Sequence, residues 1–261
     1  MLLRNLRSAF GIQHLENSML SKQRTSKNNL LLASFTASTA GMTNIAGVMA
    51  CYAFTSNVTG HAVQFANHML TGNFFEMFVV FGWLMMFILG AGIAHFLIRL
   101  YEFKGPYFAH ALPIVVVFCL LIFIAIFGYH MHEDSEKDIL ILSFALLLTM
   151  GMQNGAVNTI SEGKIKTSHL TGLFTDLGAE LSEWPHSKTG RPQHLAERIQ
   201  LRTFILGFYI FGALIGGWLF MKISFSTFYA IAASLLILVF YDFAAIGMKR
   251  NDRNDAPGLS K

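Results

Sequence analysis

The sequence predicts an all-α polytopic membrane protein with six transmembrane helices in two inverted three-helix repeats, and three observations carry this prediction. Apolar residues make up 54% of the 261 residues and charged residues only 13%, where an ordinary soluble domain carries about 25% charge. Six apolar windows are each long enough for the roughly 20 residues that cross a ~30 Å hydrocarbon core. Two short motifs also occur twice. The composition excludes a soluble enzyme, a disordered chain and a disulfide scaffold.

The apolar windows divide the chain into five segments. A basic stretch, residues 1–29, precedes the first window and is too long and polar for a cleavable signal. The first three-helix repeat covers 30–128, an external acidic loop 129–138, and the second repeat 139–247, with a cytoplasmic loop at 161–200. Residues 248–261 form a tail. The predicted spans are Leu30–Ala53, Phe74–Ile98, Phe108–Gly128, Ile139–Ile160, Leu201–Met221 and Phe225–Gly247.

The distribution of Lys and Arg favours one orientation. With the N-terminus in the cytoplasm, 17 of the 19 positive residues fall on cytoplasmic segments. Only Lys137 and Lys222 fall outside, and the loop around Lys137 is acidic. Because cytoplasmic loops carry the excess of positive residues, we predict that both termini are cytoplasmic. The net charge of +4 is therefore a topology signal, and we expect no nucleic-acid partner.

Two motifs recur in the same order in the two halves. Gly41-Met42-Thr43-Asn44 lies in the first span and is followed by Thr-Ser-Asn-Val-Thr-Gly at 55–60. Gly151-Met152-Gln153-Asn154 lies in the fourth span and is followed by Thr-Ser-His-Leu-Thr-Gly at 167–172, at offsets of 110 and 112 residues. Since three spans is an odd number, the second repeat enters the membrane from the opposite side. Secondary transporters are often built from such inverted repeats.

The Thr-Gly pairs predict short helices between the spans. Residues 59–70 contain no charged residue, and a helix there places His61, Gln64 and His68 on one face. Thr59 or Thr171 can cap the first N–H groups, and Gly60 or Gly172 lets a ligand approach the backbone. A helix start inside the membrane favours anions. The alternative is that both motifs are capping turns at opposite membrane surfaces.

Polar residues inside the apolar spans are further site candidates. Asn44 and Asn154 occupy matched positions, where an unpaired amide is costly, and Gln153 is adjacent. They either coordinate a solute or ion or form interhelical hydrogen bonds. Asp176 lies just beyond the second Thr-Gly pair and is the candidate for proton coupling, whereas Glu180 is expected to be solvated.

The sequence predicts neither an enzyme nor a cofactor or metal site. His130 and His132 lie close together in the outer loop, but no second ligand cluster occurs at a standard spacing. Cys51 and Cys119 lie in apolar stretches and are expected to be packing residues. No phosphate-binding loop or dinucleotide fingerprint is present. An intramembrane enzyme that uses His61 and His68 is disfavoured, because no nucleophile lies at a recognisable spacing from a base.

With these motifs in view, the sequence resembles the YoaK-like family of uncharacterised bacterial inner-membrane proteins. The resemblance rests on Thr59-Gly60 in the first half and on Gly151, Gln153, Asn154 and Leu170-Thr171-Gly172 in the second. It implies a multi-pass protein of the bacterial inner (plasma) membrane and brings no established substrate. Relatives often have aspartate at the position of Asn44 and asparagine at that of His61, so a proton carried by that aspartate is lost here or moved to His61 or Asp176.

The functional prediction is a secondary transporter or facilitator of a small polar or anionic solute. The residues expected to line its path are Asn44, Thr59, Gly60, His61, Gln64, Gln153, Asn154, Thr171, Gly172 and Asp176. Its expected partners are the lipid bilayer, the solute and a second copy of the chain. A homodimer is expected because six spans are few for a complete pathway, and a monomeric mass in mild detergent would contradict it. The alternative is a membrane-embedded structural or regulatory module that transports nothing.

Overall fold

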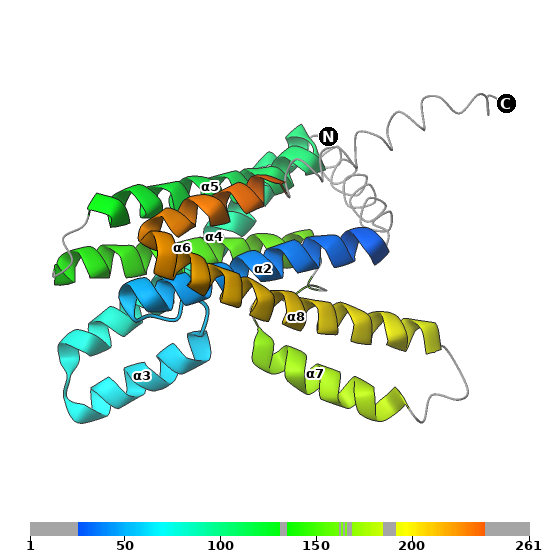
Figure 1. The fold of residues 1–261 in the computed structure, drawn as a ribbon, viewed down its shortest axis with the longest axis horizontal. Helices are drawn as coiled ribbons and strands as arrows, with labels where there is room; N and C mark the ends of the chain where they lie inside the picture. The colour runs from blue at the N-terminus through cyan, green and yellow to red at the C-terminus, as the bar shows by residue number, and fades with distance from the viewer. Residues whose placement is uncertain are drawn as a thin grey trace, which may run out of the picture.

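The computed structural model describes residues 26–130, 135–161, 163, 165, 169–184 and 192–237, and these residues are almost entirely helical (Figure 1). The segment 1–25, the tail 248–261 and the motif residues Thr167 and Ser168 lie outside the described residues. The elements are α2 (Ser26–Cys51), α3 (Val58–Thr71), α4 (Phe74–Tyr101), a 3-10 turn η1 (Glu102–Lys104), α5 (Pro106–His130), α6 (Glu136–Ile160), α7 (Leu170–Glu183), α8 (Pro192–Ile223) and η3 (Ser224–Ser226). Residues 227–237 continue as helix.

Four helices of the described residues are long and apolar enough to cross a membrane. They are Phe74–Tyr101, Phe108–His130, Glu136–Ile160 and His194–Ile237. The last contains the fifth predicted span and the first part of the sixth, because the chain turns at Ser224, whose φ of 47° is left-handed, and then runs back along the bundle as far as the described residues extend (Figure 1). The all-helical, multi-pass architecture is as predicted, while the six-span count stays a prediction.

The helix α2 is the first predicted span, and its composition explains why it is not among these four. Small or hydroxyl-bearing residues fill its buried face, and each hydroxyl bonds a carbonyl four residues earlier in the same helix, so the side chains are satisfied without water. The residues that bond in this way are Ser34, Thr36, Thr39 and Thr43. The helix is therefore compatible with apolar surroundings although its residues are less apolar than those of the other spans.

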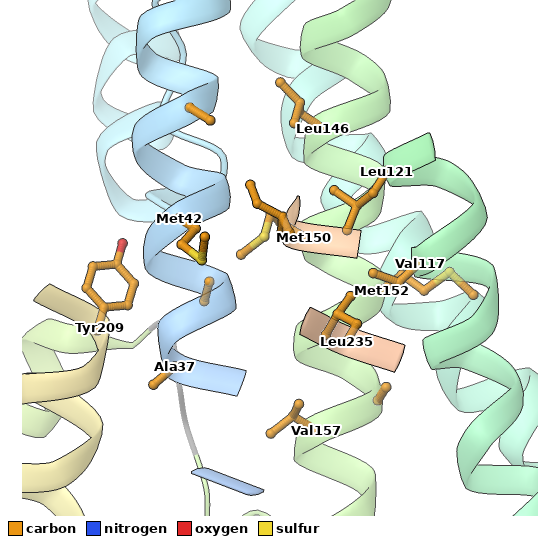
Figure 2. Packing of buried hydrophobic residues seen from close by; sticks show 14 of the residues in the cluster. Ala37, Met42, Val117, Leu121, Leu146, Met150, Met152, Val157, Tyr209 and Leu235 are labelled. Carbon is orange, nitrogen blue, oxygen red and sulfur yellow. The ribbon is translucent and has the colours of Figure 1, made fainter. Parts of the chain in front are cut away.

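The core lies between α2 and α6 and is closed by α5 and α8. Figure 2 shows Met42 of α2 and Met150 of α6 in the buried cluster where these two helices pack. Leu121 of α5 lies on the α6 side of this cluster, and Tyr209 of α8 lies on the far side of α2. Met42, Met150 and Leu121 are all buried. Flexible methionine side chains fill irregular gaps well, which suits the centre of a bundle whose helices meet at different angles.

Two helix pairs cross with their backbones almost in contact. A Cβ atom at Gly41 of α2 would overlap the carbonyl oxygen of Tyr209, and one at Gly212 of α8 would overlap that of Ser38. The pair α4 and α6 crosses in the same way, because a Cβ at Gly151 would overlap Phe87 O and one at Gly90 would overlap Leu148 O. Only glycine fits at these positions, as is typical of tightly packed membrane helices.

The short helices predicted at the Thr-Gly pairs are present as α3 and α7, each of 14 residues. Figure 1 shows both on the same side of the bundle, starting near its middle and running outward toward opposite ends. The N-terminal ends of α3 and α7 are therefore the ends that face each other. The prediction that Thr59 and Thr171 cap these helices is wrong, because Asn57 and His169 hold the N-cap positions and the threonines lie in the first turn.

Candidate functional site

The link between α2 and α3 folds back along α2. Asn44 Oδ1 accepts hydrogen bonds from the backbone N–H of Thr55 at 2.8 Å and from its hydroxyl at 3.1 Å. Because Asn44 lies seven residues before Cys51 at the end of α2, Thr55 sits about 10 Å back from that end at 1.5 Å rise per residue. Gly47 makes room for the returning chain, since a Cβ there would overlap the Thr55 methyl group. The link thus returns to the last third of α2 before α3 begins at Val58.

The same asparagine joins this link to α8. Asn44 Nδ2 donates to the hydroxyl of Tyr209 at 2.6 Å, and Ser56 also hydrogen-bonds this hydroxyl. Thr55 is fully buried. Both the oxygen and the nitrogen of the Asn44 side-chain amide are therefore hydrogen-bonded, and this amide would be costly to bury without such partners. Asn44 lies one turn from the crossing at Gly41, so the polar group is placed at the tightest part of the bundle.

The first turn of α3 is fixed by Asn57 and His61. The Asn57 side chain accepts from the N–H of Gly60 at 3.1 Å. His61 is buried, and its Nε2 lies 2.6 Å from the carbonyl oxygen of Phe54, so Nε2 carries the proton and donates. Its Nδ1 lies 3.0 Å from the amide of Gln64. Of the predicted inward face of α3, His61 is buried, whereas Gln64 is exposed and its side chain contacts the ring of His61.

The ring of His61 rests on α4. It meets Trp83 edge to face, with 5.1 Å between ring centroids. The Trp83 indole N–H then donates to the Ser143 hydroxyl of α6 at 2.9 Å. A chain of contacts therefore runs from the start of α3 through α4 to α6 and contains no charged side chain.

In α6 the amides behave differently from Asn44. Gln153 is buried and its Nε2 donates to the carbonyl oxygen of Thr36 at 3.2 Å. Among the described residues, Gln153 Oε1 and Asn154 Nδ2 have no hydrogen-bond partner. Thr167, which is 112 positions beyond Thr55, lies outside the described residues. The centre of α6 therefore holds unused hydrogen-bonding capacity.

The helix α7 is held to α8 by charges. Glu180 is buried, with its oxygens 3.3 Å from Arg198 Nε and 2.8 Å from Arg202 Nε. Arg202 also bonds Asp176, and Arg198 lies 3.9 Å from Glu183. We refer to these five residues as the α7–α8 ion cluster. The expectation that Glu180 is solvated is wrong: Asp176 is the exposed carboxylate and Glu180 the buried one, because the arginines of α8 cover it.

The structure does not bring the ten predicted site residues together in one place. In the first half, Asn44 and His61 both bond the link that precedes α3, and Gln64 bonds His61. Gln153 and Asn154 lie together on α6. Thr59, Thr171 and Gly172 are exposed, Gly60 is half-buried, and Asp176 joins the ion cluster.

Sequence reasoning missed Tyr209, Trp83 and the arginines of α8. The aromatic residues are two among many in apolar spans, and only the fold places them beside Asn44 and His61. Arg198 and Arg202 were counted only as topology signals. The sequence does carry one sign of this pairing: Arg198 and Arg202 are four residues apart, as are Asp176 and Glu180, so each pair lies on one face of its helix. No group of three metal-ligating side chains occurs within the described part of the chain.

Comparison with known proteins identifies a family and no function. No curated protein and no solved structure matches the chain. The pattern of a family described as protein of unknown function (DUF1275) matches residues 32–241, which include every helix described above except the first residues of α2. An uncharacterised family is what the resemblance of the Thr-Gly motifs implies. The chain therefore belongs to the DUF1275 family of proteins of unknown function.

Proposed function

We propose that this chain is a secondary transporter or facilitator of a small polar or anionic solute in a bacterial inner membrane, acting as a homodimer. The observation that carries the proposal is the link into α3, which the Asn44–Thr55 hydrogen bonds hold beside α2 about 10 Å before the end of that helix. A helix that begins at that depth is a half-helix of the kind that forms solute sites in transporters. A capping turn at the membrane surface would instead follow the end of α2.

The crossings of the helices support an inverted repeat of six spans. Gly151 follows Gly41 by 110 residues, and the carbonyls that the two meet, Phe87 and Tyr209, are 122 residues apart. Gly90 and Gly212 are also 122 residues apart, and their partners Leu148 and Ser38 are 110 apart. One pair of offsets thus relates both crossings. This relation is expected if α2, α4, α6 and α8 are the first two spans of each repeat.

The facing ends of α3 and α7 favour a polar or anionic solute. The first four N–H groups of a helix have no partner within the helix, and the dipole adds partial positive charge there. In α3 the N–H of Gly60 is taken by Asn57, and that of His61 by the Asn57 carbonyl. Among the described residues we find no partner for the N–H groups of Val58 and Thr59, which would remain for a ligand. Asn154 Nδ2 offers a further donor on α6.

Energy for transport would come from an ion gradient or from the solute's own gradient. Asp176 is a poor candidate for carrying the coupled proton, because its carboxylate pairs with Arg202. The distribution of positive residues favours a cytoplasmic position for the α7 end of the bundle and an external one for the α3 end.

The proposal is tested by the depth from which Thr59 and Thr171 react. In a background with Cys51→Ala and Cys119→Ala, single cysteines replace Thr59 or Thr171, and impermeant thiol reagents are added to either side of sealed vesicles. Both threonines are exposed, so reactivity reports access to water and not local unfolding. We expect each position to react from both sides, with a balance that shifts when a solute or ion gradient is applied.

Matched controls lie at the other ends of the same helices. Thr71 ends α3 and Ser182 lies in the last turn of α7. A cysteine at Thr71 should react only from outside, and one at Ser182 only from the cytoplasm. If Thr59 and Thr171 behave like these controls at every gradient, the helices start at the membrane surfaces, and the non-transporting module becomes the better description.

A further inference from the structure

The helix α7 is anchored by two buried side chains, Leu173 near its start and Glu180 near its end. Leu173 is an ordinary apolar contact. Glu180 is a carboxylate with only 6% of its side chain exposed, and it is enclosed by the guanidinium groups of Arg198 and Arg202. One of the two buried side chains of α7 is therefore a charged group, and carboxylates are seldom buried unless they are paired.

The geometry of the ion cluster joins the two helices over more than one turn. Asp176 and Glu180 are four residues apart on α7, and Arg198 and Arg202 are four apart on α8, so each pair shares one face of its helix. Arg202 bridges Asp176 and Glu180, while Arg198 bridges Glu180 and Glu183. Glu180 is the one member that contacts both arginines. Removing its charge breaks both bridges at their common point.

The cluster is only partly removed from water. The side chains of Asp176, Glu183 and Arg198 are 55%, 64% and 46% exposed. Ion pairs in such surroundings are far weaker than fully buried ones, because water screens the charges and competes for them. The contact can therefore hold α7 and still be broken at a modest cost in free energy.

The α3 end of the molecule has no such device. The helix α3 contains no Lys, Arg, Asp or Glu, and it contacts α4 through His61 on Trp83 and Phe65 near Phe81. Of the two short helices, therefore, only α7 is held to the bundle by charged side chains. That helix is the one at the end that the positive residues assign to the cytoplasm.

We propose that the α7–α8 ion cluster is a latch, with Glu180 as its central group, that closes the solute path at the cytoplasmic end by holding α7 against α8. The closing of a path rests on the proposed transport function, whereas the holding of α7 does not. When the latch opens, α7 moves away from α8 and uncovers Leu173 beneath its first turn.

The latch is tested with a cysteine at Leu173 in the background with Cys51→Ala and Cys119→Ala. Leu173 is buried, so a small soluble thiol reagent reaches it only when α7 lifts, and the labelling rate follows the population of the open form. We expect Glu180→Gln to increase this rate about ten-fold, because two bridges are lost at once. Glu180→Asp, which keeps the negative charge, should raise the rate less than Glu180→Gln does.

Two controls separate the latch from general loosening. Glu183→Gln removes an exposed carboxylate 3.9 Å from Arg198, and it should change the rate less than about two-fold. A cysteine at Thr59 should keep its labelling rate in all of these variants. If Glu180→Gln does not give a monodisperse protein, Arg198→Gln, which removes one bridge at a half-exposed side chain, takes its place.

Each outcome decides one of the proposals. The latch is wrong if Glu180→Gln and Arg198→Gln both leave the rate at Leu173 unchanged, or if Glu183→Gln raises it equally. If Leu173 responds as expected but Thr171 reacts from one side at every gradient, the latch holds α7 in a protein that does not transport. If Thr171 reacts from both sides while Leu173 never responds, transport stands without the latch.

Discussion

In the first half of the molecule α3 is held by uncharged contacts, whereas in the second half α7 is held by an ion cluster. The two helices have equal length and follow matched motifs. Yet His61 lies on Trp83 in the first half, and Glu180 lies between two arginines in the second. The backbone arrangement is thus shared, while the side chains that secure it differ. The comparison shows that two short helices of equal length can be secured against the bundle by different chemistry, aromatic contacts in one case and ion pairs in the other.

The crossings provide the strongest test of whether the halves share a scaffold. Gly41→Ala and Gly151→Ala each force a Cβ into a backbone carbonyl, so we expect each to lower the free energy of unfolding by roughly 3 kcal/mol, the upper range for overpacking. Thermal unfolding in detergent measures both. Gly178→Ala on α7 is the control, because nothing lies within 4 Å of its Cβ position. Clearly unequal losses at Gly41 and Gly151 would mean that the two crossings are not equivalent.

The matched asparagines should differ. Asn44→Ala leaves the Thr55 N–H without its partner and removes one of the two partners of the Tyr209 hydroxyl, and we expect a loss of about 1–3 kcal/mol in unfolding free energy. Asn154→Ala should cost less than about 1 kcal/mol, since its Nδ2 has no partner among the described residues. Chemical denaturation of both variants in the same detergent makes the comparison. An equal loss would show that Asn154 has a structural partner as strong as that of Asn44.

A smaller effect than that of Asn44→Ala is expected from Tyr209→Phe. This change removes one hydroxyl and makes the α2–α8 crossing match the α4–α6 crossing, where Phe87 occupies the corresponding place. The loss of the hydrogen bonds of this hydroxyl to Asn44 and Ser56 should cost about 1 kcal/mol. Thermal unfolding of the variant and of the unmodified chain in the same detergent measures this loss. A loss as large as that of Asn44→Ala would mean that Tyr209, and not Thr55, is the main partner of the asparagine.

The helices could be predicted because their signal is local. The length of each apolar window and the positions of Gly and charged residues placed the described spans to within about four residues, except that α8 begins at Pro192, nine residues before the predicted start at Leu201. The short helices followed from the absence of charge after Thr59 and from the repeated Thr-Gly pair. Their caps did not follow, because Asn57 and Thr59 are both suitable N-cap residues and only the path of the preceding link decides between them.

The partners within the site could not be predicted, because they come from distant parts of the chain. Asn44 meets Tyr209 across 165 residues, and His61 meets Trp83 from another helix. Glu180 has the same local surroundings as a solvated residue, namely a polar stretch near the end of a short helix. Its burial follows only from the way α8 packs against α7. Tertiary contact therefore reverses the expectation drawn from sequence for that residue.

The close crossing of α2 with α8 has a consequence for how the protein is made. The residues that satisfy Asn44 include Tyr209, which is synthesised 165 residues later. At about 5–20 residues per second, roughly ten to thirty seconds separate the two on the ribosome. Throughout that interval the face of α2 that α8 later covers at Gly41 has no permanent neighbour in the nascent chain. The first helix of the described structure is therefore completed only after α8 has been made.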